Sequence, residues 1–201
     1  MANIRLVALD IDGCLTAGEA KPFDFEALAF IAALNRRARV DAAQFAVTLC
    51  TGRPEPYVEA LTQAIDGFMP AIFENGGGLY FPSPYRFAFN PAITPPMRAT
   101  LADIRSVLQR ELVATGIAQF QPGKEVTATL YPSRADVSLA QLATMARAAV
   151  GDRLDGYAIF ASVSCVEIMP KGIDKGAALE WLSQETGIAL SEMAGIGDAP
   201  A

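Results

Sequence analysis

Histidine is absent from the 201-residue chain, and its absence excludes several familiar kinds of active site. The chain can form no Ser-His-Asp or Cys-His catalytic arrangement, no phosphohistidine and no histidine metal site. Acid–base chemistry is left to Asp, Glu, Lys, Tyr or Cys. A metal site would consist of oxygen ligands, which favours Mg²⁺ or Mn²⁺ over Zn²⁺.

Cysteine, basic runs and long apolar segments are also scarce. The three cysteines (Cys14, Cys50, Cys165) form no CxxC pair, which fits a reducing cytoplasm. The formal net charge is −6, so we expect neither nucleic acid nor an anionic membrane as a partner. No apolar run reaches membrane-spanning length, and carboxylates occur too early in the N-terminal segment for a secretory signal. We therefore expect a soluble cytoplasmic protein, for which both a monomer and a homodimer fit the sequence.

The residues that are present describe a globular chain, with 52% hydrophobic and 19% charged residues. Apolar runs that are typical of buried strands alternate with helical patterns through the first eighty residues, as in an open doubly wound sheet. The predicted order is strand, helix, strand, helix, and then a strand with a short return strand, over residues 4–12, 24–39, 43–52, 54–65 and 70–81.

Five prolines within residues 82–96 indicate a domain boundary. The following segment has a mixed α+β pattern, and the doubly wound pattern resumes with a helix at 171–187 and a final strand. We therefore predict an α/β fold with a doubly wound (Rossmann-like) parallel sheet core and an inserted α+β cap domain. The predicted core is 1–82 and 159–201, and the predicted cap is 83–158.

Asp10 and Asp12 follow the first predicted strand, and ligands of open α/β sheets bind beyond the carboxyl ends of the strands. Two carboxylates placed there repel each other unless a cation lies between them or one carries a proton. A strand-end turn with a helix-capping aspartate explains the pair equally well. The pair alone leaves both interpretations open.

Three further features lie at strand ends or helix starts. Thr51 and Gly52 precede a helix and form either an anion site or an ordinary helix cap. Lys175 lies at a helix start, where the dipole disfavours a cation, so it has either an anionic partner or full solvation. Asp198 ends the last apolar strand. Their alignment on one edge of one sheet favours a site.

The order of these motifs resembles that of the haloacid-dehalogenase-like (HAD) superfamily. "DIDGCLT" resembles its first motif, DxDGxLT, "TGR" its second, Lys175 in "GIDKGAAL" its third and "GIGD" the start of its fourth. The place of the insertion resembles the subgroup with a C2-type cap. "FENGGGLY" and the short cap are similar to phosphoglycolate, sucrose-phosphate and mannosyl-3-phosphoglycerate phosphatases.

The resemblance implies a phosphoric monoester hydrolase that uses Mg²⁺ and acts on a small phosphorylated metabolite through an aspartyl-phosphate. Asp10 would be the nucleophile and Asp12 the general acid and base. Mg²⁺ would bind Asp10, Asp12 through its carbonyl, and Asp198. The phosphoryl group would be held by Thr51, Gly52 and Lys175.

Other residues are candidates for contacts with the substrate. Arg53 and Asn75 would support the site or face the substrate, although each could simply hold a loop. The cap would close over the site, and Lys124 and Glu125, with Arg134 as a further choice, would reach the substrate from it. A solvated hairpin turn explains Lys124 and Glu125 equally well.

The chain departs from the family at its end. The fourth motif usually continues as GDSxND, whereas Asp198 is followed here by Ala-Pro-Ala, so we expect that the C-terminal end of the family fold is missing. Two alternatives to a phosphatase therefore stay open. One is a sugar phosphomutase on the same scaffold, and the other is a catalytically impaired or truncated protein that binds a phosphorylated ligand.

Overall fold

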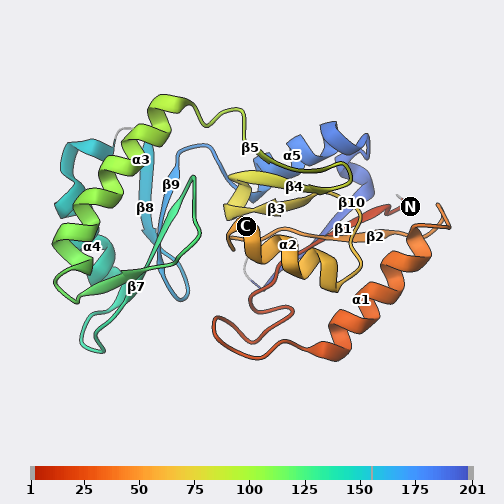
Figure 1. The fold of residues 1–201 in the computed structure, drawn as a ribbon, viewed down its shortest axis with the longest axis horizontal. Coiled ribbons are helices and arrows are strands. Elements are labelled where there is room, and N and C mark those ends of the chain that lie inside the picture. Colours follow the sequence, from red (N-terminus) through yellow and green to blue (C-terminus); the bar gives the residue numbers. More distant parts are fainter. Residues whose placement is uncertain (1–2, 155, 199–201) are drawn as a thin grey trace. The chain divides into compact units, whose positions relative to one another are not determined.

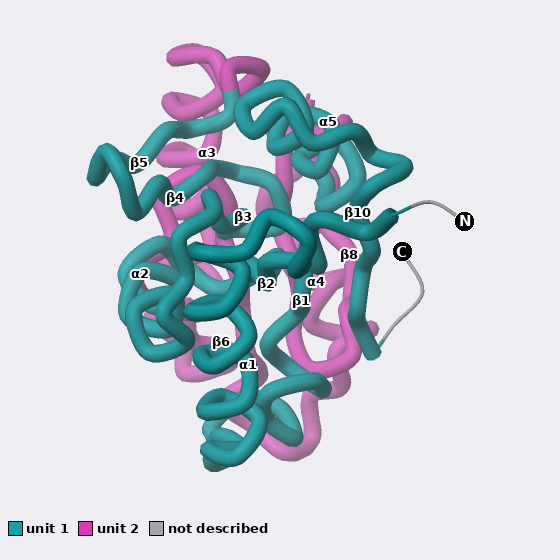
Figure 2. Tube along the Cα trace, turned by 90° about the vertical axis from the view of Figure 1, so that its right-hand side faces the viewer, with its two compact units in different colours: residues 1–90, 174–201 teal, residues 91–173 magenta. Residues whose placement is uncertain are grey.

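The computed structural model describes residues 3–154 and 156–198, which form two compact units. Unit 1 comprises residues 1–90 and 174–201, and unit 2 comprises residues 91–173 (Figure 2). The sequence placed these divisions after residues 82 and 158. The structure divides later because β5 hydrogen-bonds to β4, and β9 pairs with β7 and β8.

The sheet of unit 1 begins with three parallel strands in the order β10-β1-β2 (Figure 1). A parallel bridge between Cys50 and Ile72 places β3 beside β2, and β3-β4-β5 continue as an antiparallel meander. Its strands are β1 (Leu6–Leu9), β2 (Ala46–Leu49), β3 (Ala71–Phe73), β4 (Gly78–Pro82), β5 (Tyr85–Phe89) and β10 (Met193–Ile196).

Helices cover both faces of this sheet. Alternate residues of a strand point to opposite faces, and Val7 packs with α1 (Phe25–Ala38) and α2 (Glu55–Ala64), whereas Leu6 packs with α5 (Lys175–Thr186). The helix starts follow capping rules: Asp24 caps α1, Pro54 precedes α2 and Asp174 caps α5. The predicted α/β fold with a doubly wound parallel sheet is therefore confirmed.

Unit 2 is an antiparallel sheet in the order β6-β7-β9-β8, with two helices packed on one face. Its core joins apolar side chains of the sheet to those of both helices. The elements are α3 (Pro95–Leu108), β6 (Ala118–Phe120), β7 (Ala128–Pro132), α4 (Leu139–Val150), β8 (Tyr157–Ala161) and β9 (Val166–Pro170).

Short helical turns complete the two units: η1 (Glu74–Gly76), η2 (Gln109–Val113), η3 (Gly151–Leu154) and η4 (Leu190–Glu192). Within residues 3–154 and 156–198, none of the helices combines the length and the apolar character needed to cross a membrane.

Candidate active site

Three strands of unit 1 end at the same edge of the sheet, and candidate site residues follow each of them. Asp10 follows β1, Thr51 lies two residues after β2, and Asp198 lies two residues after β10. Backbone hydrogen bonds hold this edge in register: the N–H of Asp10 donates to Ile196 at 2.9 Å, and that of Cys50 donates to Leu9 at 2.8 Å. The parallel pairing thus brings together residues that are far apart in the sequence.

Asp10 forms an ion pair with Lys175, the first residue of α5. The other carboxylate oxygen of Asp10 accepts a hydrogen bond from the N–H of Ile11 at 2.8 Å. Asp174 caps α5 by accepting from the N–H of Ala177 at 2.8 Å, which fixes the turn that carries Lys175. The lysine at this helix start therefore has an anionic neighbour, the candidate nucleophile.

Asp12 accepts two hydrogen bonds from Arg53, from Nε at 2.7 Å and from a terminal nitrogen at 2.6 Å. The guanidinium also lies 4.8 Å from the centre of the Tyr57 ring. A bidentate guanidinium–carboxylate pair fixes both side chains in one orientation. Sequence reasoning had placed Arg53 near the site without identifying Asp12 as its partner.

Thr51 is fully buried, and its hydroxyl oxygen accepts a hydrogen bond from the N–H of Arg53 at 3.1 Å. Its carbonyl accepts from the N–H of Asn75 at 2.9 Å, and the Asn75 side chain lies against Gly52, where a Cβ would approach within 2.9 Å of its amide atoms. Asn75 itself has φ of 54°. In this geometry Asn75 packs against the turn that carries Thr51 and Gly52.

Gly13 allows the side chain of Asp198 to lie against the loop that follows Asp12. A Cβ at Gly13 would lie 2.6 Å from Cβ of Asp198, and the φ of Gly13 is +79°. Both the left-handed backbone and the close approach require glycine. Asp198 is thereby placed beside the segment that carries Asp10 and Asp12.

The electrostatics of nearby cysteines reflect the same cluster of charges. Burial raises the pKa of Cys14, the charges of Asp10 and Asp198 raise it further, and Lys175 opposes them. Burial likewise raises the pKa of Cys50 to about 12, with Lys175 acting in the opposite direction. A raised pKa favours the protonated thiol, whereas the thiolate is the reactive form. Neither thiol is therefore a good nucleophile.

The donor atoms at this edge fit a small hard cation. Within the described residues, no group of three or more Asp, Glu, Cys or His side chains is close enough to hold a metal. The set expected from the sequence uses only two carboxylates, Asp10 and Asp198, with the carbonyl of Asp12. Mg²⁺ is commonly held by one or two carboxylates together with water and substrate phosphate, so this set fits it.

Lys124 and Glu125 lie in unit 2, in the loop between β6 and β7. Glu125 is exposed, whereas Lys124 is buried and forms an ion pair with Glu167 at 3.6 Å. Glu167 also accepts from Thr129 at 2.8 Å. Sequence reasoning did not identify Glu167 or Thr129 as neighbours of Lys124. The signal that could have drawn attention to them is that each is a polar residue within an otherwise apolar strand.

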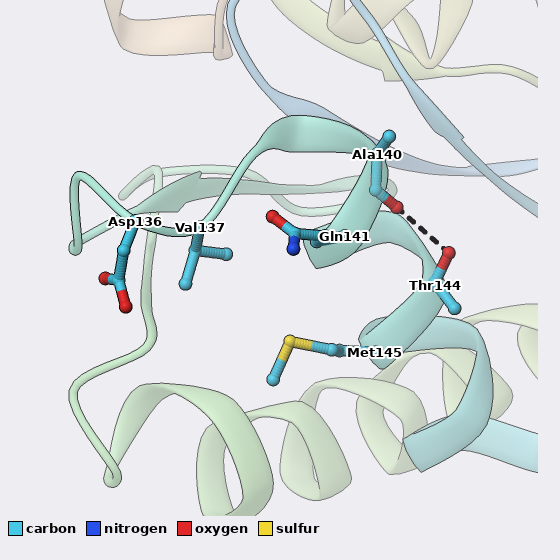
Figure 3. A pocket seen from close by; sticks show the side chains of 6 residues that line it. All are labelled: Asp136, Val137, Ala140, Gln141, Thr144 and Met145. Carbon is cyan, nitrogen blue, oxygen red and sulfur yellow. Dashed lines mark hydrogen bonds between the residues drawn. The ribbon is translucent and has the colours of Figure 1, made fainter.

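A hollow in unit 2 lies beside the start of α4 (Figure 3). Its charged residue, Asp136, is paired with Arg134 at 2.7 Å, and both are exposed. None of the predicted site residues lines this hollow, which is formed by Asp136, Val137, Ala140, Gln141, Thr144 and Met145.

Comparison with known proteins supports the resemblance. The family model of haloacid dehalogenase-like hydrolases matches residues 120–201. An HMP-PP phosphatase of Citrobacter koseri is 27% identical over 223 aligned positions, covering 97% of this chain and 78% of the relative. A phosphoglycolate phosphatase of Pyrobaculum aerophilum is 26% identical over 196 positions, covering 97% and 75%.

Some matches are more local. The HMP-PP phosphatase of Klebsiella pneumoniae is 44% identical over 50 residues, which amount to 25% of this chain and only 18% of the relative's length.

Solved structures share the fold. A HAD/COF-like hydrolase from Plasmodium vivax has a TM-score of 0.71 at 15% identity, covering 99% of this chain and 80% of that one. The sucrose-phosphatase of Synechocystis sp. PCC6803 has a TM-score of 0.64 at 15% identity, covering 98% and 76%. The predicted resemblance to haloacid-dehalogenase-like hydrolases is confirmed, and the phosphatase-named relatives support an enzyme of the phosphatase class.

Proposed function

We propose that the protein is a Mg²⁺-dependent phosphatase that hydrolyses a small phosphorylated metabolite in the cytoplasm through an aspartyl-phosphate. The observation that carries this proposal is the ion pair of Asp10 with Lys175 at the end of β1. A carboxylate beside a fixed ammonium can attack phosphorus while the ammonium holds a phosphoryl oxygen.

In the first step, a carboxylate oxygen of Asp10 attacks phosphorus and the bond to the leaving-group oxygen breaks. Asp12 donates a proton to that oxygen. The hydroxyl of Thr51 accepts from the N–H of Arg53, so its own proton is available for a phosphoryl oxygen, beside the amide of Gly52. Phosphoryl transfer depends mostly on such positioning and charge neutralisation.

In the second step, water attacks the phosphorus of the aspartyl-phosphate, and the bond to the Asp10 oxygen breaks. Asp12 takes the proton of the water and is ready for the next cycle. Both oxygens of Asp12 accept from Arg53 in the structure. Each carboxylate oxygen has a second acceptor site, so Asp12 can exchange a proton there while Arg53 holds its orientation.

Asp10, the carbonyl of Asp12 and Asp198 would hold Mg²⁺. The bound cation would neutralise charge on the phosphoryl oxygens. Gly13 contributes indirectly, because its lack of a side chain lets Asp198 lie beside the loop that carries Asp12.

A panel of phosphorylated metabolites tests the proposal, including the substrates for which the relatives are named. We expect phosphate release that requires Mg²⁺, stops with a chelator and is lost in Asp10→Asn. Isomerised product with little free phosphate would indicate a sugar phosphomutase instead. Tight binding of phosphorylated ligands without turnover would indicate a catalytically impaired protein.

A further inference from the structure

The outward face of α1 carries a large apolar side chain that is mostly exposed. Phe30 is 62% exposed, and α1 is an outer element of unit 1 (Figure 1). The buried residues of the helix lie on its opposite side: Leu28, Ile31, Ala32 and Asn35. Residues three and four apart share one face of a helix. Glu26, Phe30, Ala33 and Arg37 therefore form a single stripe that points away from the core, the outer stripe of α1.

The two charged residues of the outer stripe are Glu26 and Arg37. Both are exposed, and neither forms an ion pair in the part of the chain that the structure describes. Arg37 donates from Nε to the carbonyl of Ala33 at 3.3 Å, which leaves its terminal nitrogens for another acceptor. The neighbouring Arg36 instead pairs with Asp66 at 3.7 Å. The outer stripe thus offers one unpaired charge of each sign.

The order of residues in the outer stripe is complementary to itself when the helix direction is reversed. Glu26 lies four residues before Phe30, and Arg37 lies four residues after Ala33. In an antiparallel pair of α1 helices with the two-fold axis between Phe30 and Ala33, each Glu26 lies opposite the second copy's Arg37. Each Phe30 lies opposite the second copy's Ala33, so a large side chain meets a small one. Parallel packing would instead bring the basic last turns of the two helices together.

We propose that the outer stripe of α1 is an interface for a second copy of this chain, packed antiparallel about a two-fold axis. The two Phe30 side chains supply the apolar contact. The two Glu26–Arg37 pairs fix the direction and register of the helices, because charge complementarity contributes specificity more than affinity. One pair of helices is a small interface, so we expect a dimer in equilibrium with the monomer.

Sedimentation velocity of the full chain over a concentration series measures this equilibrium, and we expect the wild type to dimerise. Phe30→Ala removes the apolar contact twice in each dimer and should raise the dissociation constant by roughly 100-fold. Tyr85→Ala is the matched control, because Tyr85 is 63% exposed and lies on β5, away from the outer stripe. It should leave the dissociation constant unchanged.

Charge reversal tests the antiparallel register. Glu26→Lys places a cation opposite the second copy's Arg37, and Arg37→Glu places an anion opposite the second copy's Glu26. Each variant alone should therefore dimerise about tenfold more weakly. An equimolar mixture of the two variants should dimerise as tightly as the wild type, because both charge pairs are then complementary. Glu26→Lys/Arg37→Glu should likewise recover dimerisation, and thermal unfolding verifies that each variant is folded.

A chain that stays monomeric at every concentration overturns the proposal and leaves the outer stripe to a different partner or to solvent. A dimer that Phe30→Ala leaves intact overturns it as well, since the contact then lies elsewhere. If the two charge variants dimerise weakly and their mixture does not recover, the antiparallel pairing is rejected and the proposal fails. Recovery in the mixture supports it, because a loss of folding in either variant could not produce that result.

Discussion

Arg53 holds both carboxylate oxygens of Asp12, at 2.7 and 2.6 Å, while its guanidinium lies against the ring of Tyr57. This relationship connects the loop after β1 to the turn after β2. It restrains the side chain that must move a proton in the proposed reaction.

Replacing Arg53 by Met should lower kcat by about tenfold, because Asp12 loses its fixed orientation. The free energy of unfolding should fall by about 1 kcal/mol, a modest cost since the Asp12 side chain is 33% exposed. Arg53→Lys keeps the charge but cannot form the two parallel hydrogen bonds. Its kcat and its free energy of unfolding should lie between those of the wild type and of Arg53→Met. Steady-state kinetics and urea unfolding measure both effects; wild-type values in Arg53→Met would contradict the role of the pair.

Replacing Thr51 by Val keeps the shape of a fully buried side chain and removes its hydroxyl. The N–H of Arg53 loses its acceptor, so we expect stability to fall by about 1 kcal/mol. KM should rise because the phosphoryl group loses a donor. Thr51→Ser retains the hydroxyl and should keep KM near the wild-type value. Equal KM values in the Val and Ser variants would show that the hydroxyl of Thr51 does not bind the phosphoryl group.

Replacing Gly13 by Ala should impair Mg²⁺ binding, because the new Cβ would occupy the place of the Asp198 side chain. Gly172→Ala is a matched control: Gly172 has the same φ of +79°, and a Cβ there meets nothing within 4 Å. Both variants carry the cost of a left-handed backbone, about 1 kcal/mol. Only Gly13→Ala should need more Mg²⁺ for half-maximal activity, and an equal requirement in both would reject the placement of Asp198.

Cys50 should make the protein less stable in alkaline solution. Its pKa is raised to about 12, chiefly by burial, so the folded thiol keeps its proton after the unfolded thiol has lost it. Above pH 9 the folded state binds more protons, and stability falls by up to about 1.4 kcal/mol per pH unit. Cys50→Ala should flatten this slope in urea unfolding between pH 9 and 10.5. An unchanged slope would show that Cys50 does not cause it.

The strand ends of the candidate site could be predicted from the sequence, because local signals mark them. Asp10 and Thr51 follow short buried strands, Asp198 follows a short apolar strand, and parallel pairing of the three strands brings them to one edge. The resemblance to a known family then gave each residue a role. Lys175 was also identifiable, since a lysine at a helix start is unfavourable without an anionic neighbour.

Pairings between distant segments could not be predicted in this way. The contact of Arg53 with Asp12 depends on how two turns meet, and no periodicity records it. The same limit applies to the unit boundaries, which depend on antiparallel pairs such as β9 with β7. The sequence left Lys124 open between a substrate contact and a solvated turn, and neither interpretation included its burial beside Glu167 of a distant strand.

The most direct test of the central claim is mass spectrometry of the peptide that contains Asp10, after rapid acid quenching of a reaction with a hydrolysed substrate. With p-nitrophenyl phosphate, whose leaving group departs without needing a proton, Asp12→Asn slows chiefly the breakdown of the intermediate, so we expect that variant to accumulate one phosphoryl group on Asp10. Asp10→Asn should carry none and should release no phosphate. Phosphate release by Asp10→Asn at the wild-type rate would contradict the aspartyl-phosphate mechanism.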